Sequence, residues 1–285
     1  MTAESGAAAR HSVIPERYDM NSREIMAELF APAENGFDYS KTCDTCKSGD
    51  PEAEVSRVGV TMFATPETIR AAAAWGAQLL IVHEPTFYNH MDVESDEPVE
   101  QMKRKLVADS GMVIWRFHDH AHHLPADVIC AGIFRELDLD AEIDYTRGVS
   151  LVDPRATLRV PMTPREMARR IEEKLGVAHV RICGAADVPC TKLTAMVGAP
   201  GKIVFDELKN EDSEMILTGE TCEWGYGEYA RDAAYFGLKK ALLILGHVGS
   251  ERAGMALVAD QLAAAHPELS VKYFDTPEVY TYTDK

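Results

Sequence analysis

The stretch VSRVGVTMFATPETIRAAAAWGAQLLIV, residues 55–82, predicts a strand, a helix and a second strand. Its first part, Val55–Phe63, alternates and is rich in β-branched residues, which favours a strand. Pro66 after a threonine is typical of a helix start, and Gly76 is typical of a helix end. Leu79–Val82 is short and wholly apolar, as expected of a strand that is covered on both faces of its sheet. This stretch therefore predicts one strand–helix–strand unit of a mainly parallel sheet.

The same alternation continues along the chain. Ser22 is expected to cap a helix over Arg23–Phe30, and residues 32–54 are predicted to form a loop rich in Pro, Gly, Asp and Ser. Further strands are predicted at Met112–Phe117, Leu193–Val197, Met215–Leu217 and Ala241–Leu245, and further helices at Val99–Asp109, 126–137, Arg165–Leu175 and Ser250–Ala265.

This pattern predicts an α/β fold made of two related α/β halves with mostly parallel or mixed sheets. A chain of 285 residues has room for two units at about 150 residues each. We expect a flexible N-terminal arm at residues 1–20, a first half at 21–150 and a second half at 151–285.

The charge balance excludes some classes of partner. The chain has 46 Asp and Glu against 29 Lys and Arg, a formal net charge of −17. Binding to a nucleic-acid backbone or to anionic lipid requires a basic surface, so neither is expected. No apolar run is long enough for a membrane span and the N-terminal residues lack a secretory h-region, so a cytoplasmic location is expected.

Cys43 and Cys46 form the one Cys-x-x-Cys pair of the sequence. Such a pair can be a redox centre or half of a zinc site. Here it lies among polar residues rather than at the start of a helix, and no second pair is present. Free thiols are therefore the expectation, and the role of this pair is left open.

Metal-binding types of side chain follow three of the predicted strands. In open α/β sheets, ligands gather beyond the carboxyl ends of the strands. A polar loop in solvent is the alternative for any single histidine, but three such loops at strand ends favour a metal site, since imidazole and carboxylate are common metal ligands. The three segments are His83-Glu84, the run from His118 through His120 and His122 to His123, and His247 with Glu251.

His247 and Glu251 are four residues apart, so their side chains can converge at the mouth of the last helix. Ser250 is the expected N-cap of that helix, which would place Glu251 in its first turn. A carboxylate there can also serve only to offset the helix dipole. Glu220, after another strand, is a candidate base or substrate contact, and His90 with Asp92 are weaker candidates in an acidic loop.

These residues resemble the Nif-three-like dinuclear metal-centre family, whose members carry the name type-2 GTP cyclohydrolase I. The resemblance covers residues 22–280 and depends on four segments, which are Val82-His-Glu-Pro85, Phe117-His118 with His122, Thr218-Gly-Glu220 and Gly246-His-Val-Gly-Ser-Glu251. It implies two related α/β halves, two metal ions in the cleft between them, and a hexameric ring.

The resemblance also implies a ligand set, from which this chain departs at two of five positions. The second His of the family's His-His pair is Glu84 here, and the family's Asp falls on His122, or on His123 after a shift of one residue. Three His and two carboxylates remain, so the formal charge is unchanged. The implied ligands are His83, Glu84, His122, His247 and Glu251.

The predicted function is a metal-dependent hydrolase that acts on a C–N bond of a small molecule, such as a cyclic amide or amidine, through metal-activated water. One or two divalent ions (Zn, Mn, Fe or Co) are expected per chain. The alternative is a non-catalytic metal-binding ring protein, a regulator or metal carrier, which turnover would distinguish. The candidates for moving the proton are Glu84, His118, His120 and Glu220.

Overall fold

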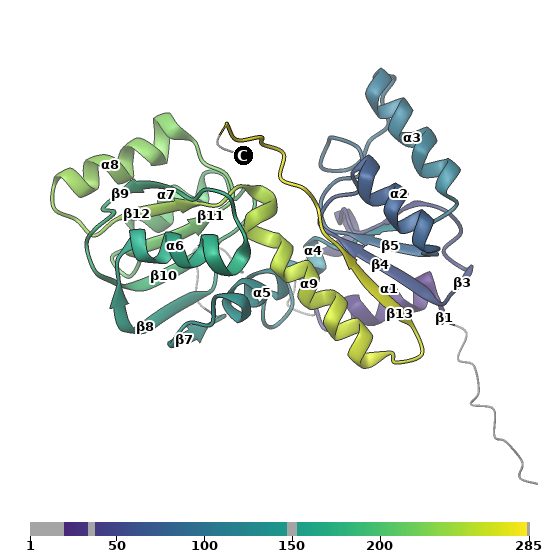
Figure 1. Ribbon diagram of the computed structural model, residues 1–285, viewed down its shortest axis with the longest axis horizontal. Coiled ribbons are helices and arrows are strands. Elements are labelled where there is room, and N and C mark those ends of the chain that lie inside the picture. Colours follow the sequence, from purple (N-terminus) through teal and green to yellow (C-terminus); the bar gives the residue numbers. More distant parts are fainter. Residues whose placement is uncertain (1–19, 34–37, 147–152, 284–285) are drawn as a thin grey trace, which may run out of the picture.

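The computed structural model describes residues 20–33, 38–146 and 153–283. These residues form two lobes, each built around a sheet of mixed direction (Figure 1). The predicted α/β class with two halves is therefore confirmed. Apart from Met20, the predicted N-terminal arm lies outside the described residues, as does the predicted boundary at residue 150.

The first sheet has five strands in the order β13-β4-β5-β6-β2, and all are parallel except β2, which runs antiparallel to β6. β13 comes from the C-terminal end of the chain, so the first lobe includes residues from both predicted halves. The strands are β2 (Cys46–Ser48), β4 (Arg57–Thr61), β5 (Leu79–Val82), β6 (Val113–Arg116) and β13 (Ser270–Phe274). A separate pair is formed by β1 (Met20–Asn21) and β3 (Glu54–Val55).

Both faces of this sheet are buried. Along β5, Leu79 and Ile81 face a core that includes the first and last helices of the chain, while Leu80 and Val82 face a second core on the other side. This arrangement explains why the central strand is wholly apolar rather than alternating.

The second sheet has six strands in the order β7-β8-β10-β11-β12-β9. Its centre, β10-β11-β12, is parallel and its remaining strand pairs are antiparallel. The strands are β7 (Ala141–Asp144), β8 (Arg155–Met162), β9 (Arg181–Gly184), β10 (Cys190–Met196), β11 (Met215–Thr218) and β12 (Ala241–Ile244).

The long helix α9 (His247–Ala265) runs between the two lobes (Figure 1). It packs against α5 (Val128–Leu137) at a close crossing, because Gly254 lies against the backbone of Ile129 and Gly132 lies against that of Ala253. A Cβ atom at Gly254 would lie 2.3 Å from Ile129 Cα, so only glycine permits this approach.

The other helices cover the faces of the sheets, and none in the described part of the chain has the length and apolar character needed to span a bilayer. They are α1 (Ser22–Phe30), α2 (Pro66–Trp75), α3 (Pro98–Ser110), α4 (Asp119–His122), α6 (Pro164–Leu175), α7 (Ile203–Lys209) and α8 (Glu228–Tyr235), with a 3-10 turn at Tyr39–Lys41 and a π-helical turn at Glu223–Gly227.

Two predicted helix caps were wrong. The N-cap of α1 is Asn21 rather than Ser22, since its side chain accepts from the Glu24 N–H while the Glu24 carboxylate accepts from the Asn21 N–H. The last helix begins at His247 after Gly246, whose φ of 81° favours glycine, so Ser250 lies inside the helix. The predicted loop over 32–54 also contains β2 and the 3-10 turn.

A candidate metal centre between the two sheets

The side chains after the central strands of both sheets meet in one cluster. His83 and Glu84 directly follow β5, and His118 lies two residues beyond β6. The second lobe contributes His247, the first residue of α9, and Glu251, one turn further along the helix. Because both sheets present the carboxyl ends of parallel strands here, residues that are far apart in sequence converge.

His247 lies between two carboxylates. Its Nε2 atom is 3.1 Å from Glu84 Oε1 and 3.2 Å from Glu251 Oε2. The same Glu251 oxygen lies 3.7 Å from His83 Nε2, and the same Glu84 oxygen lies 3.7 Å from His118 Nε2. These contacts connect the two lobes through side chains that can all bind a cation.

Three imidazoles complete the cluster on the side of the first sheet. The ring centroid of His83 lies 4.8 Å from that of His118 and 5.1 Å from that of His122, and the last two are 5.0 Å apart. The ligand-type atoms of these three histidines lie within 4.8 Å of one another, as do those of His83, Glu84 and Glu251. His83 belongs to both groups.

All four imidazoles of the cluster are held through Nδ1. Carbonyl and carboxylate oxygens only accept hydrogen bonds, so Nδ1 donates in each case and Nε2 is directed into the cluster. An acceptor on the outer nitrogen is the usual way in which a protein orients a metal-binding histidine. The acceptors are the Phe117 carbonyl for His83 (2.9 Å), Asp119 for His118 (2.9 Å), Asp127 for His122 (2.9 Å) and Glu220 for His247 (2.8 Å).

The carboxylates hold protons on two of these imidazoles. Burial would lower the pKa of His247, but hydrogen bonds to Glu251 and Glu84 outweigh it and raise that pKa to about 11. Burial is also outweighed at His122, where the charge of Asp127 raises the pKa to about 9. Burial lowers the pKa of His83 well below its usual value, so that ring is neutral. A cation at this position would take the place of the protons.

Two buried atoms in the cluster face one another at 3.7 Å: His83 Nε2 has no hydrogen-bond partner among the described residues, and Glu251 Oε2 has only the His247 imidazole, 3.2 Å away. Both residues are almost fully buried, at 0% and 2% exposure. Unpaired buried polar atoms are costly, and a lone pair of imidazole beside a carboxylate oxygen is the donor set that a divalent ion of the Zn, Mn, Fe or Co type accepts. The residues therefore fit a metal ion.

The loop after β10 also contributes through Gly198, a residue that the sequence analysis did not select. A Cβ atom at Gly198 would lie 2.2 Å from Glu251 Oε1, and its φ of 62° independently favours glycine. Its N–H donates to Ser250 Oγ at 2.9 Å. Ser250 thus connects this loop to α9, and the signal in the sequence was the glycine that directly follows a buried strand.

His120 does not join the cluster. Its ring stacks between those of Phe30 and Tyr39, at centroid distances of 4.0 and 3.9 Å, and its Nδ1 donates to Asp44 Oδ2 at 2.7 Å. The proton-shuttle candidate that remains near the cluster is His118. His123 Nδ1 donates to the Asp119 carbonyl at 2.6 Å, and of these two neighbours it is His122 whose ligand-type atom lies with those of His83 and His118.

The remaining candidates lie around the cluster. His90 packs edge-on against His118 with ring centroids 5.6 Å apart, whereas Asp92 is 3.0 Å from Lys47 in a buried ion pair. All six cysteines lie in the described ranges and are free. Burial raises the pKa of Cys43 far above its usual value, so this thiol stays protonated, and its Sγ lies 3.4 Å from Asp119 Oδ1.

Two cavities open onto the cluster. The smaller one, about 370 Å³, reaches His118 and His122, and the larger one, about 740 Å³, reaches Glu220. Both are lined by Glu84 and His247. A small molecule in either cavity therefore has access to the same side chains.

Comparison with known proteins identifies the family and agrees with the two-lobed fold. The sequence profile described as Duf34/NIF3 (NGG1p interacting factor 3) matches residues 25–278. A Clostridium perfringens protein named "GTP cyclohydrolase 1 type 2 homolog" is 23% identical over 209 residues, which cover 71% of this chain and 76% of that protein. Among solved structures, a Staphylococcus aureus hypothetical protein has a TM-score of 0.73 at 15% identity, covering 93% of this chain and 99% of that one. A Bacillus cereus protein related to NIF3 has a TM-score of 0.71 at 13% identity, covering 93% and 98%. The chain belongs to the Duf34/NIF3 family.

Proposed function

We propose that this protein is a metal-dependent hydrolase that cleaves a C–N bond of a small molecule. The observation that carries the proposal is the buried His83 Nε2 atom, which has no hydrogen-bond partner among the described residues and lies 3.7 Å from Glu251 Oε2 in a cluster of imidazoles. The residues that would hold one or two divalent ions are His83, Glu84, His122, His247 and Glu251, with His118 as a further nitrogen donor.

A bound divalent ion supplies two things to such a reaction, a lowered pKa for water and polarisation of the scissile carbonyl or amidine. The protein's own contribution is to hold the donors in place. Asp127 and the Phe117 carbonyl fix the rings of His122 and His83, so little reorganisation is needed when a charge binds.

Glu220 is the best-placed group for moving a proton. Its Oε1 accepts from His247 Nδ1, and its side chain is 59% exposed and lines the larger cavity. Glu220 Oε2 can therefore take a proton from a nucleophile and return it to a leaving nitrogen. Glu84 is only 8% exposed and contacts two imidazoles, which suits a ligand better than a base.

The test has two parts. Metal analysis of the purified protein, together with its native mass, should give one or two ions per chain in an oligomer, and His247→Ala should abolish metal binding without unfolding the protein. The metal-loaded protein, incubated with a panel of pterins, purines, lactams and amides, should release ammonia, formate or acid. Metal without any turnover would favour the alternative function, a regulator or metal carrier. Full metal occupancy and activity in His247→Ala would refute the proposal.

Self-association, as in a hexameric ring, is part of this proposal. Its support is a set of large exposed apolar side chains at the two ends of helix α8 in the second lobe. They are Trp224 (86% exposed), Tyr235 (85%), Phe236 (77%) and Leu238 (52%).

A further inference from the structure

Helix α3 carries a lysine on its buried face. Glu100, Lys103 and Val107 are the buried residues of this helix. Glu100 is fully accounted for, because it accepts from Ser95 N–H and Oγ and pairs with Arg104. Lys103 is 8% exposed, yet its Nζ has no hydrogen-bond or ion-pair partner among the residues that the structure describes. A buried, unpaired ammonium is unfavourable for folding, so its presence calls for a reason.

Lys103 lines the larger cavity, the one that also reaches Glu84, Glu220 and His247. It is the only lysine or arginine among the described residues of that lining, whereas Glu67 and Glu278 add to the two glutamates already named. Outside the cavity, the charge of Asp92 partly offsets the effect of burial on the Lys103 pKa, but the Asp92 carboxylate lies 3.0 Å from Lys47 in a buried ion pair. Lys103 therefore faces a space that a ligand can fill.

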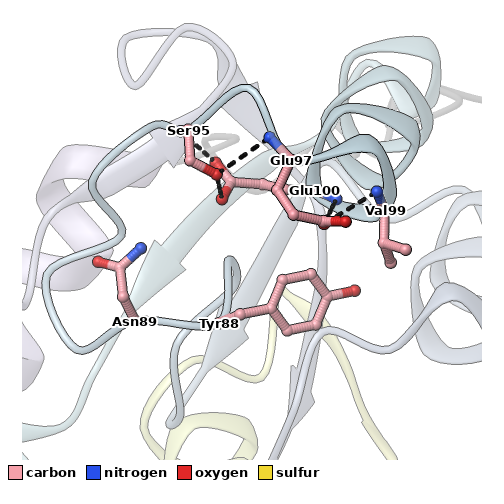
Figure 2. A pocket seen from close by; sticks show the side chains of 6 residues that line it. All are labelled: Tyr88, Asn89, Ser95, Glu97, Val99 and Glu100. Atoms are coloured by element: carbon pink, nitrogen blue, oxygen red, sulfur yellow. Dashed lines mark hydrogen bonds between the residues drawn. The ribbon is translucent and has the colours of Figure 1, made fainter.

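Tyr88 lies next to this lysine. The Lys103 Nζ atom is 5.0 Å from the centroid of the Tyr88 ring, within range of a cation–π contact. Figure 2 shows the Tyr88 ring beneath the first turn of α3, and Tyr88 lines both the hollow drawn there and the larger cavity. Its backbone has a φ of 42°, a strained conformation for an aromatic residue that tends to persist at binding sites.

The state of the lysine agrees with this role. Burial lowers the pKa of Lys103 to about 8, so that at neutral pH the amine is still mostly charged. A ligand that carries a negative charge would restore the electrostatic balance that the protein leaves incomplete.

We propose that Lys103 binds a carboxylate of the substrate, so that this site takes a small cyclic amide with a single acidic group. The nature of the reacting bond in this inference rests on the proposed function, whereas the negative charge of the ligand is inferred from Lys103 and the cavity lining alone. One lysine against four glutamates in the cavity lining suits a monoanion, since a polyphosphate would be repelled by the remaining walls.

The test uses two probes that have the same ring, orotate, which carries a carboxylate, and uracil, which does not. Calorimetric titration of the full-length, as-purified protein should give at least about 10-fold tighter binding of orotate, the effect expected of one charge-assisted contact. Lys103→Met should erase this preference, and Lys103→Arg should keep part of it. Lys105→Met, an exposed lysine on the same helix, is the matched control and should leave the preference unchanged.

The thermal midpoint separates a binding role from a structural one. Lys103→Met replaces an unpaired buried charge by an apolar side chain of similar length, so Tm should stay the same or rise. Equal affinity for the two probes, an orotate preference that survives in Lys103→Met, or no orotate binding at millimolar concentration would overturn the inference. Because binding is measured without turnover, these outcomes are distinct from a failure of the hydrolase proposal.

Discussion

Two histidines of the short helix α4, two residues apart, have the same kind of partner and different surroundings. His120 Nδ1 donates to Asp44, and His122 Nδ1 donates to Asp127, both within 3.0 Å. The faces of the His120 ring are covered by Phe30 and Tyr39, whereas the His122 ring lies against the imidazoles of His83 and His118, the first of which has an unpartnered Nε2. A carboxylate on Nδ1 therefore does not identify a ligand. The side chains that surround the ring determine whether the histidine can serve as a metal ligand.

The most direct test of this difference between His122 and His120 is to remove the two rings separately. We expect His122→Ala to lose most of its bound metal, because it deletes one of the clustered imidazoles and leaves the buried Asp127 Oδ2 without its histidine partner. Metal content per chain, measured after gel filtration, should fall below about one tenth of the wild-type value, since losing a ligand costs more than the 10–100-fold typical of an outer partner. A variant that still carried full metal would remove His122 from the centre.

A smaller effect is expected from the partner of His122. Asp127→Asn keeps an oxygen for the N–H groups of Ile129 and Cys130 at the start of α5, but it replaces the acceptor of His122 Nδ1–H by an amide. Metal affinity should fall by about 10–100-fold, with helix α5 intact. Competition with a chelator measures the affinity, and circular dichroism checks the fold. An unchanged affinity would mean that Asp127 does not orient the ligand.

The matched change at His120, the histidine outside the cluster, should leave metal binding unaffected. His120→Ala removes a ring stacked between Phe30 and Tyr39 and leaves buried Asp44 without its side-chain partner. We expect a loss of roughly 2–4 kcal/mol in the free energy of unfolding, from the cavity and the lost hydrogen bond together. Metal content of the folded protein should equal that of the wild type. Loss of metal without loss of stability would reverse the roles assigned to the two histidines.

The sequence could predict the strands that build the site but not the difference between these histidines. Leu79–Val82 and Ala241–Ile244 are wholly apolar and lie between turn signals, so their position and the polar residues after them could be predicted from local pattern alone. Which of His118, His120 and His122 joins the cluster depends on α1 and on the loop that carries Asp44. Both are far from α4 in the sequence but contact it in the fold. No local pattern contains that information.

The same limit applies to the boundaries of the lobes. The last strand, β13, pairs with β4 across more than two hundred residues, and its return places α9 against both sheets. The sequence pattern did not predict that strand, because SVKYF is half-exposed and short. The glycine contacts at Gly254 and Gly198, which fix α9 and Glu251, likewise depend on tertiary neighbours.

The central claim is that residues of both lobes hold one metal centre, and an anomalous-scattering experiment tests it most directly. Diffraction from crystals of the metal-loaded protein is measured at the absorption edge of the metal found by elemental analysis. It should give an anomalous peak within bonding distance of His83 Nε2 and His247 Nε2. These atoms come from the ends of different sheets, so only the assembled cleft can produce that peak. A peak confined to the neighbouring group of Cys43, His90 and Asp119, or no peak in either place, would contradict it.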